Sequence, residues 1–126
     1  MILGLGLDLV DIGRVAAVLD RHPARARRRL FTPGEVAYCD RRTEPARVFA
    51  ARFAAKEARY KALAGTPEAR LISWQDLEVV SDPDGRPRLV LHGAAAARAA
   101  ELGVRQAHLT LTHADGMAAA VVVLDG

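Results

Sequence analysis

The sequence predicts an α+β domain in which an antiparallel sheet packs against one long helix. Three observations carry this prediction: an apolar segment with branched residues at 2–12, a run of strong helix formers at 46–64, and two strand-like segments at 108–113 and 117–124. This order of elements is that of an α+β domain built on antiparallel sheet. The chain has 126 residues, enough for one core, and we expect a single domain over residues 1–126.

The N-terminal part is predicted to form one strand followed by short helices. Residues 2–12 (ILGLGLDLVDI) have the length and composition of a mostly buried strand, which Asp8 interrupts. Residues 14–21 repeat apolar residues at helical spacing, and the basic HPARARRR after them indicates a solvated helix face or a loop. Residues 32–35 (TPGE) form a capping-box pattern, which predicts a short helix running toward Cys39.

The longest predicted helix covers residues 46–64. Its sequence (ARVFAARFAAKEARYKALA) is rich in strong helix formers, and Gly65 and Pro67 are the expected stop signals.

The next segment predicts a hairpin and a further helix. Residues 75–81 and 88–92 have strand character, and the Pro-Asp-Gly sequence at 83–85 forms a turn between them. Residues 94–102 are rich in alanine and predict a helix that ends at Gly103.

Two strands joined by a turn at residues 114–116 are predicted to close the domain. Residues 117–124 are apolar throughout, so we expect this strand to be covered on both faces. His108 and His113 are separated by an odd number of residues, which places them on opposite faces of the sheet and argues against a joint metal site. His113, next to the turn, is better placed to reach a ligand, although a turn-capping role fits equally well.

Composition excludes several classes of protein. No apolar run approaches the roughly 20 residues of a membrane helix, and acids stand where a signal peptide would be apolar, so we expect a cytoplasmic protein. Cys39 is the only cysteine, which excludes an intrachain disulfide and favours a solitary buried thiol.

The net charge of +3 is distributed unevenly. Residues 1–61 carry 13 Lys/Arg against 7 Asp/Glu, and residues 62–126 carry 5 against 8. A basic surface attracts an acidic partner, but charge alone does not identify that partner. Of the 18 basic residues only Lys56 and Lys61 are lysines, and both lie in the predicted long helix.

Phe53, Glu57 and Lys61 are spaced four residues apart and therefore lie along one helix face. An ordinary exposed Glu-Lys pair would explain this spacing and would contribute only ~0.3 to 0.5 kcal/mol. Arg52, Lys56 and Arg59 are expected to surround Glu57 with positive charge, which instead favours an anionic ligand beside a metal-binding carboxylate.

Asp8 lies within an apolar strand, where an ionised carboxylate is costly unless it is paired or binds a cation. A structural salt bridge or a cap would satisfy it. Together, however, Asp8 and Glu57 supply two oxygen ligands, which is how Mg²⁺ is commonly held when substrate phosphates and waters complete its coordination. The pair therefore indicates phosphate chemistry.

Other phosphate and nucleophile motifs are absent from the sequence. Gly4 and Gly6 are not followed by the third glycine or the βαβ unit of a dinucleotide fold. The sequence contains neither a Walker-type GK[ST] motif nor a nucleophile elbow.

Three segments together resemble the small bacterial holo-acyl-carrier-protein synthases: GLGLDLVDI near the start, ARFAAKEARYKAL in the long helix and LTLTHADGMAAAVVVL at the end. The order and spacing agree over nearly the whole chain, and the helix motif is highly specific. The resemblance implies the half-fold of 4'-phosphopantetheinyl transferases. It implies a transferase that moves phosphopantetheine from coenzyme A to a serine of an apo-acyl carrier protein and releases adenosine 3',5'-bisphosphate, in lipid metabolism for fatty-acid and also polyketide synthesis.

The resemblance also implies a site that depends on Mg²⁺. Asp8 and Glu57 would coordinate the metal. The serine proton would pass to Glu57 directly or through a metal-bound water, and Lys61 would stabilise or protonate the leaving phosphate. An ammonium can give up a proton whereas a guanidinium essentially cannot, so arginine should not replace Lys61.

The remaining partners follow from the same resemblance. The residues that would bind coenzyme A include Arg52, Phe53 and His113 as well as Lys61, and the site would lie between subunits of a homotrimer. Acidic side chains of the carrier would meet a basic first helix. The carrier-binding residues implied on that helix are Arg14, Arg21 and Arg25.

Two positions depart from the family pattern. The loop at residues 41–45 (RRTEP) replaces a basic cluster, and Ala114 replaces a Ser/Thr after His113, so the resemblance does not imply nucleotide contacts from these two places. Asp115 could position a water molecule, but a turn aspartate is the simpler interpretation.

Two other functions remain open from the residues alone. An arginine-rich segment at 21–29 could bind nucleic acid, although few aromatic residues accompany it and a solvated charge run explains it better. A Mg²⁺-dependent phosphohydrolase would cleave coenzyme A without a carrier. The expected partners are coenzyme A and a carrier protein, with neither nucleic acid nor membrane.

Overall fold

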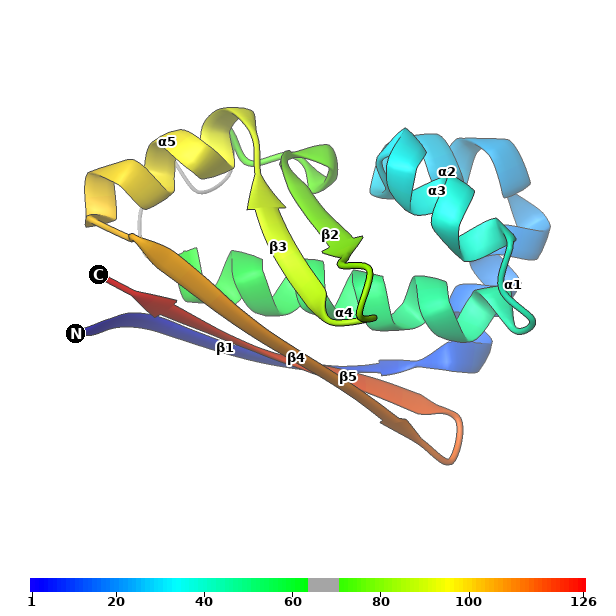
Figure 1. The fold of residues 1–126 in the computed structure, drawn as a ribbon. Coiled ribbons are helices and arrows are strands. Elements are labelled where there is room, and N and C mark those ends of the chain that lie inside the picture. Colours follow the sequence, from blue (N-terminus) through cyan, green and yellow to red (C-terminus); the bar gives the residue numbers. More distant parts are fainter. Residues whose placement is uncertain (64–70) are drawn as a thin grey trace.

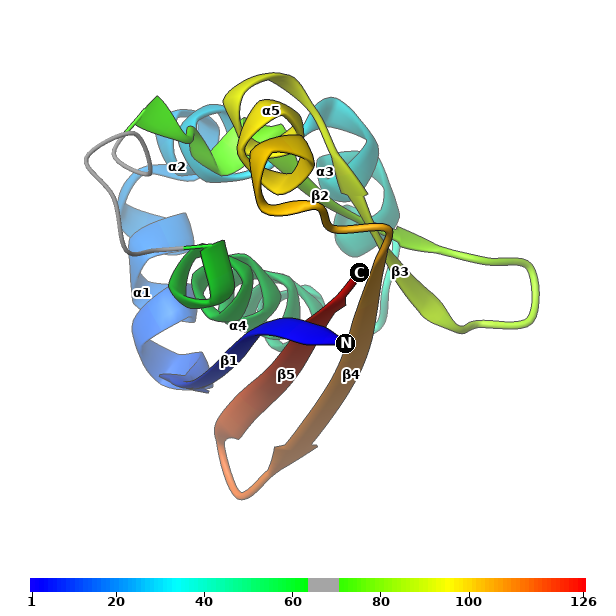
Figure 2. The same ribbon diagram turned by 90° about the vertical axis from the view of Figure 1, so that its left-hand side faces the viewer.

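The computed structural model describes residues 1–63 and 71–126. Its central element is helix α4 (Pro45–Leu63), which lies between two layers. A three-stranded sheet covers one side of this helix, and a two-stranded hairpin with helix α5 covers the other (Figures 1 and 2). Three shorter helices stand at one end of α4 (Figure 1). The architecture confirms the predicted α+β class.

The three-stranded sheet has the order β1-β5-β4, and both pairings are antiparallel. Its strands are β1 (Ile2–Asp11), β4 (Gln106–Ala114) and β5 (Met117–Asp125). The turn between β4 and β5 contains Asp115 and Gly116, both with a positive φ, of 50° and 78°. Asp115 therefore forms part of the turn, as the simpler interpretation of the sequence had it.

The second layer consists of the hairpin β2 (Leu77–Ser81) with β3 (Pro87–Leu91), followed by α5 (Gly93–Leu102). The predicted hairpin and helix are confirmed, and Gly103 ends α5 with φ 78°. The predicted start of the first of these strands was too early, because Trp74–Asp76 forms a 3-10 turn, η2, capped by the Ser73 hydroxyl.

The short helices are α1 (Ile12–Arg21), α2 (Pro23–Leu30) and α3 (Pro33–Asp40). The capping box is present in full, since the Thr32 hydroxyl accepts from the Glu35 backbone and Glu35 accepts from the Thr32 backbone. The predicted long helix is confirmed, although its expected end at Ala64 and the stop signals lie outside the described residues. These signals are Gly65 and Pro67.

Two clusters of buried side chains hold the domain together. The first joins α4 to both layers, and the second lies beneath the short helices around Phe31 and Phe49. Cys39 belongs to the second cluster and is fully buried, and burial raises the pKa of its thiol to about 12. The expected buried thiol is confirmed.

Strand β1 and helix α4 approach one another closely at the glycines of β1. A Cβ atom at Gly6 would overlap the backbone carbonyl of Ala58, and one at Gly4 would contact the carbonyl of Ala62. The two glycines thus allow close packing of strand on helix, a role unrelated to dinucleotide binding.

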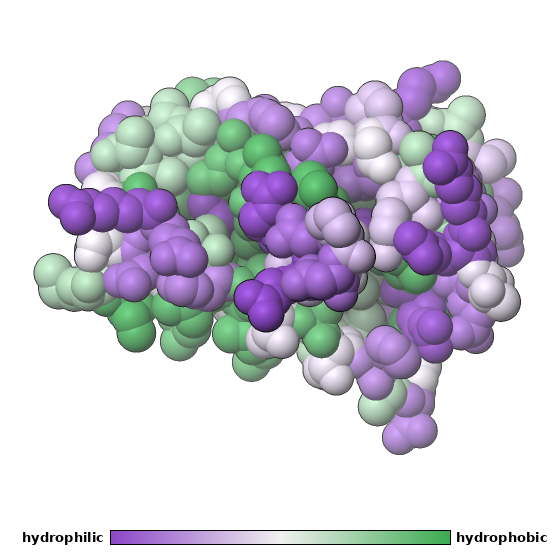
Figure 3. All heavy atoms as spheres, in the orientation of Figure 1, coloured by the Kyte–Doolittle hydropathy of each residue, from purple (hydrophilic) through white to green (hydrophobic). Residues whose placement is uncertain are grey.

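The expectation that the first and last strands are buried is wrong for one face of the sheet. Leu5, Leu7 and Leu9 are 61 to 66% exposed, and in the sheet they align with the half-buried Val121 and Val123. Figure 3 shows this face as a band of hydrophobic spheres along the lower edge of the molecule. The sequence pattern predicted a covered strand, but nothing among residues 1–63 and 71–126 covers this face.

Among the described helices, none combines the length and the apolar character needed to cross a bilayer.

Candidate active site

A cavity of about 460 Å³ opens between β1, α1 and α4. Its walls combine apolar side chains from the short helices with charged side chains from the strand and the long helix. The lining includes Asp8, Asp11, Arg14, Phe53, Glu57 and Lys61. The structure therefore brings together both predicted metal ligands, the predicted catalytic lysine, a second predicted coenzyme A-binding residue, Phe53, and one predicted carrier-binding residue, Arg14.

Asp8 points toward α4 because it shares the inner face of β1 with Gly6. Its Oδ1 lies 2.9 Å from the Nζ of Lys61, which also donates to the carbonyl of Leu7 at 3.1 Å. A hydrogen bond to Asp8 raises the pKa of Lys61. This ion pair fixes the lysine at the mouth of the cavity, where half of its side chain is exposed.

Glu57 faces the same cavity from α4. Burial raises the pKa of this carboxyl, the negative charge of Asp8 raises it further, and the positive charge of Lys61 opposes both effects. A second carboxylate thus disfavours the ionisation of Glu57, and a cation bound between the two would relieve that repulsion.

The residues present fit Mg²⁺. Asp8 and Glu57 offer two oxygen ligands, and no cluster of three His, Cys, Asp or Glu side chains that could hold a metal occurs in residues 1–63 and 71–126. Such an open site leaves coordination positions for phosphates and water, which is the usual arrangement for this ion.

A second, smaller cavity of about 240 Å³ meets the first at Glu57. Trp74 and Tyr60 line it, and the ring of Trp74 stacks on Phe53 with centroids 5.2 Å apart. Sequence reasoning missed Trp74, because the tryptophan belongs to a short turn without a motif. The only available signal was that it is the single tryptophan of the chain.

The expectation that Arg52, Lys56 and Arg59 surround Glu57 is wrong. Lys56 and Arg59 are fully buried and Arg52 is 4% exposed, and none of the three lines the cavity that holds Glu57. Lys56 pairs instead with Glu35 and donates to the carbonyl of Trp74 at 2.7 Å. Neighbours in sequence point about 100° apart on a helix, and Lys56 and Arg52 contact Trp74 and Ser81 instead of Glu57.

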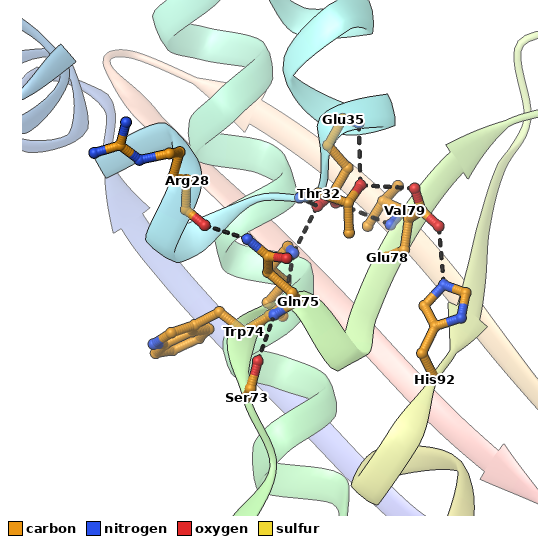
Figure 4. A network of polar contacts seen from close by, with 10 residues as sticks. Arg28, Thr32, Glu35, Ser73, Trp74, Gln75, Glu78, Val79 and His92 are labelled. Carbon is orange, nitrogen blue, oxygen red and sulfur yellow. Dashed lines mark hydrogen bonds and ion pairs between the residues drawn. The ribbon is translucent and has the colours of Figure 1, made fainter. Parts of the chain in front are cut away.

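Glu35 belongs to a polar network that joins three elements on that far side (Figure 4). Besides capping α3, it accepts a hydrogen bond from the backbone of Val79 in β2 at 2.9 Å. Glu78, next to Val79, accepts from the Thr32 hydroxyl at 2.6 Å and contacts His92 at 3.0 Å. The network fixes the hairpin against the end of α3.

Arg52 and His113 come together in a different pocket, of about 370 Å³. An Nη2 of Arg52 donates to the hydroxyl of Ser81 at 3.0 Å, and Tyr38 and Arg47 complete the polar lining. His113 faces this pocket while His108 lies on the outer sheet face, as their spacing predicted. The structure thus separates these two residues from Asp8, Glu57 and Lys61, which line the first cavity.

The three predicted carrier-binding arginines are exposed along the short helices. Arg14 lines the first cavity, and Arg21 occupies the last turn of α1. Arg25 lies on α2 rather than on the first helix, where it lines a shallow groove with His22 and Arg29. The basic surface therefore spans two helices beside the cavity.

The sequence and the fold both match known proteins. The model of the 4'-phosphopantetheinyl transferase superfamily matches residues 4–122. A holo-acyl-carrier-protein synthase of Anaeromyxobacter dehalogenans is 55% identical, with 100% of this chain and 98% of that protein covered. The crystal structure of holo-acyl-carrier-protein synthase from Neisseria meningitidis gives a TM-score of 0.87 at 26% identity and 100% coverage of both chains.

A further solved structure carries a ligand. Holo-acyl-carrier-protein synthase from Helicobacter pylori, in complex with coenzyme A, gives a TM-score of 0.81 at 26% identity, with 96% of this chain and 99% of that chain covered. The resemblance seen in the three sequence segments is thereby confirmed over the whole fold. The chain belongs to the 4'-phosphopantetheinyl transferase superfamily.

Proposed function

We propose that this protein transfers 4'-phosphopantetheine from coenzyme A to a serine of an apo-acyl carrier protein and releases adenosine 3',5'-bisphosphate. The observation that carries the proposal is the single cavity in which Asp8, Glu57 and Lys61 meet beside a basic helical surface. The relatives named as holo-acyl-carrier-protein synthases, at up to 55% identity over the full chain, support the same activity.

The reaction joins the serine oxygen to the β-phosphorus of coenzyme A and breaks the bond from that phosphorus to the bridging oxygen. Asp8 and Glu57 would hold Mg²⁺, which when bound neutralises the pyrophosphate and polarises the β-phosphate. Glu57 accepts the proton of the serine hydroxyl, a role that its raised pKa suits. Lys61, fixed by Asp8, donates to the oxygen of the departing phosphate.

The acyl carrier protein would dock on the exposed arginines of α1 and α2. Arg14 lines the cavity itself, and Arg21 and Arg25 extend the positive surface away from it. Acidic side chains of a carrier would be attracted to this surface and would orient its serine toward Glu57.

The nucleotide end of coenzyme A would bind in the pocket of Arg52 and His113. Because a single subunit places that pocket and the metal ligands in separate cavities, we infer that a complete site combines two subunits. The apolar face of Leu5, Leu7 and Leu9 supports this association, since exposed apolar patches commonly mark interfaces. We propose the homotrimer of the family as the assembly.

We propose that the reaction serves fatty-acid biosynthesis in the cytoplasm, with polyketide carriers as further acceptors. This part of the proposal rests on the reaction and is tested by comparing several apo-carriers side by side.

Mass spectrometry of an apo-carrier incubated with enzyme and coenzyme A tests the proposed reaction. The carrier should gain one phosphopantetheine only when Mg²⁺ is present, and Asp8→Ala and Glu57→Ala should each abolish the gain. Glu101→Gln is a matched control, because Glu101 is an exposed acid of α5 outside both cavities. Undiminished activity in the two site variants would refute the metal assignment, and bisphosphate release without carrier would identify a hydrolase instead.

A further inference from the structure

The ring of Tyr38, on α3, lies beneath two guanidinium groups. The Cζ atom of Arg52 is 4.2 Å from the ring centroid, and that of Arg42 is 3.9 Å from it. Both distances are well within the range of a cation-π interaction. The pKa of Tyr38 is lowered by a hydrogen bond with Ser81, against the effect of burial, and further by the charges of Arg42 and Arg52.

Arg52 depends on few other contacts. The residue is 4% exposed, and its Nη2 donates to the Ser81 hydroxyl at 3.0 Å. Its Nε is buried and has no acceptor in the described part of the chain. A buried guanidinium with so few acceptors is costly, and the face of an aromatic ring is one of the few groups that can offset that cost.

The pocket that Arg52 lines is suited to an anion. Arg47 and His113 contribute further positive or titratable groups, and no carboxylate occurs in the lining among the described residues. Arg42 lies over the same ring but does not line the pocket. Of the two cations in contact with the ring, only Arg52 therefore faces the pocket.

We infer that Tyr38 is a positioning residue for coenzyme A binding, whose aromatic face holds the Arg52 guanidinium in place for a phosphate of the nucleotide end. The inference rests on the proposed function, which supplies coenzyme A as the donor. The Ser81 hydroxyl holds one end of the guanidinium and the ring packs against its centre, so the arginine loses little freedom when the phosphate arrives. The ring, and not the phenol hydroxyl, carries this role.

Isothermal titration with adenosine 3',5'-bisphosphate tests the inference without catalysis. Tyr38→Leu removes the ring, and it should weaken binding about 5- to 10-fold, the size expected for a partly desolvated cation-π contact. Tyr38→Phe keeps the ring and should bind within about 2-fold of wild type. In steady-state assays Tyr38→Leu should raise the KM for coenzyme A and leave kcat within about 2-fold, because Tyr38 does not touch the reacting atoms.

Phenylalanines with one to three ring fluorines at position 38 keep the shape of the side chain while weakening the negative face of the ring. Affinity for the bisphosphate should fall stepwise with fluorination, a readout that remains usable if Tyr38→Leu does not fold. Equal affinity across the series, or an equal loss in Tyr38→Phe and Tyr38→Leu, would overturn the inference. Failure of the wild-type protein to bind the bisphosphate at all would instead overturn the proposed nucleotide site, and with it the role of Tyr38.

Discussion

The Nζ atom of Lys56 lies 2.6 Å from the Oε1 of Glu35, and both side chains are completely excluded from solvent. Burial lowers the pKa of Lys56, while the charge of Glu35 opposes that effect. Because Glu35 also accepts from the backbones of Thr32 and Val79, the pair connects α3, α4 and β2. Glu57 and Lys61 of the candidate site lie on a different face of α4, turned by about 100° or more from Lys56.

Breaking this buried pair should be strongly destabilising. Lys56→Met or Glu35→Gln should each cost about 3 to 5 kcal/mol, because the remaining group is left buried without its partner. The double variant should cost clearly less than the sum of the single variants. Urea unfolding of the four proteins measures these values, and additive costs would contradict a coupled pair. Glu44→Gln, in the exposed pair with Arg47, should cost less than about 0.5 kcal/mol.

Gly6→Ala should destabilise the protein by several kcal/mol. The new methyl group would overlap the carbonyl of Ala58, so β1 and α4 would have to separate, and overpacking of this kind costs about 1 to 3 kcal/mol or more. Gly13→Ala is the control, since a Cβ there would meet only the flexible side chain of Asp11. Thermal unfolding compares the two, and equal melting temperatures would disprove the close-contact argument.

Acid should weaken the network of Figure 4 through Glu78. Burial alone would raise the pKa of this carboxyl, but hydrogen bonds with Thr32 and His92 lower it below its usual value of 4.5. Folding thus favours the ionised form of Glu78. Its contribution to the free energy of unfolding is fully present above about pH 4.5 and disappears as the pH falls through the lowered pKa.

Glu78→Gln should therefore reduce stability at pH 7 by about 1 to 2 kcal/mol and make little difference at the acid end of the range. Urea midpoints between pH 3 and pH 7 measure the difference. A constant gap between variant and wild type across that range would be incompatible with this titration.

Lys61→Arg should slow transfer about 100-fold in kcat, because a guanidinium keeps the charge but cannot release a proton to the departing phosphate. The KM for coenzyme A should change much less. Lys61→Met, which lacks the charge as well, should impair both parameters. A fully active Lys61→Arg would show that the lysine acts through its charge alone.

Two inactive variants should restore activity when mixed if the site lies between subunits. Glu57→Gln lacks the proposed base, and Arg52→Ala lacks the proposed nucleotide contact. Each site would need Glu57 from one subunit and Arg52 from the adjacent subunit. In a randomly mixed cyclic assembly of equal amounts, about one quarter of the sites would have both residues intact. Subunits are unfolded together, refolded together and assayed, with separately refolded variants as the control. No recovery in co-assembled protein would place both residues in one subunit's site.

Much of the fold could be predicted because local signals were strong. The capping box at Thr32, the helix formers after Pro45 and the glycine after α5 each determine an element boundary through nearby residues alone. The start of the second strand was predicted too early because Ser73 caps a short 3-10 turn over residues 74–76. So short a turn has too few residues to leave a clear sequence pattern.

The site could be predicted only in part. Asp8 stood out because a carboxylate in an apolar strand needs a partner, and the structure places it with Glu57 and Lys61. The cations next to Glu57 in sequence were misplaced, because sequence proximity ignores the rotation of a helix and Lys56 has its own buried acid. Contacts between distant elements, such as Tyr38 with Arg52, leave no pattern in a single sequence.

The burial of Cys39 makes the lone thiol a reporter for unfolding. A thiol with a pKa of about 12 and no exposed surface reacts with alkylating reagents only after the helices above it open. Maleimide or iodoacetamide can therefore capture the new thiol on a modified carrier while the folded enzyme stays unlabelled. The slow labelling of Cys39 itself then measures how often the second core opens, on the same sample and in the same mass spectrum.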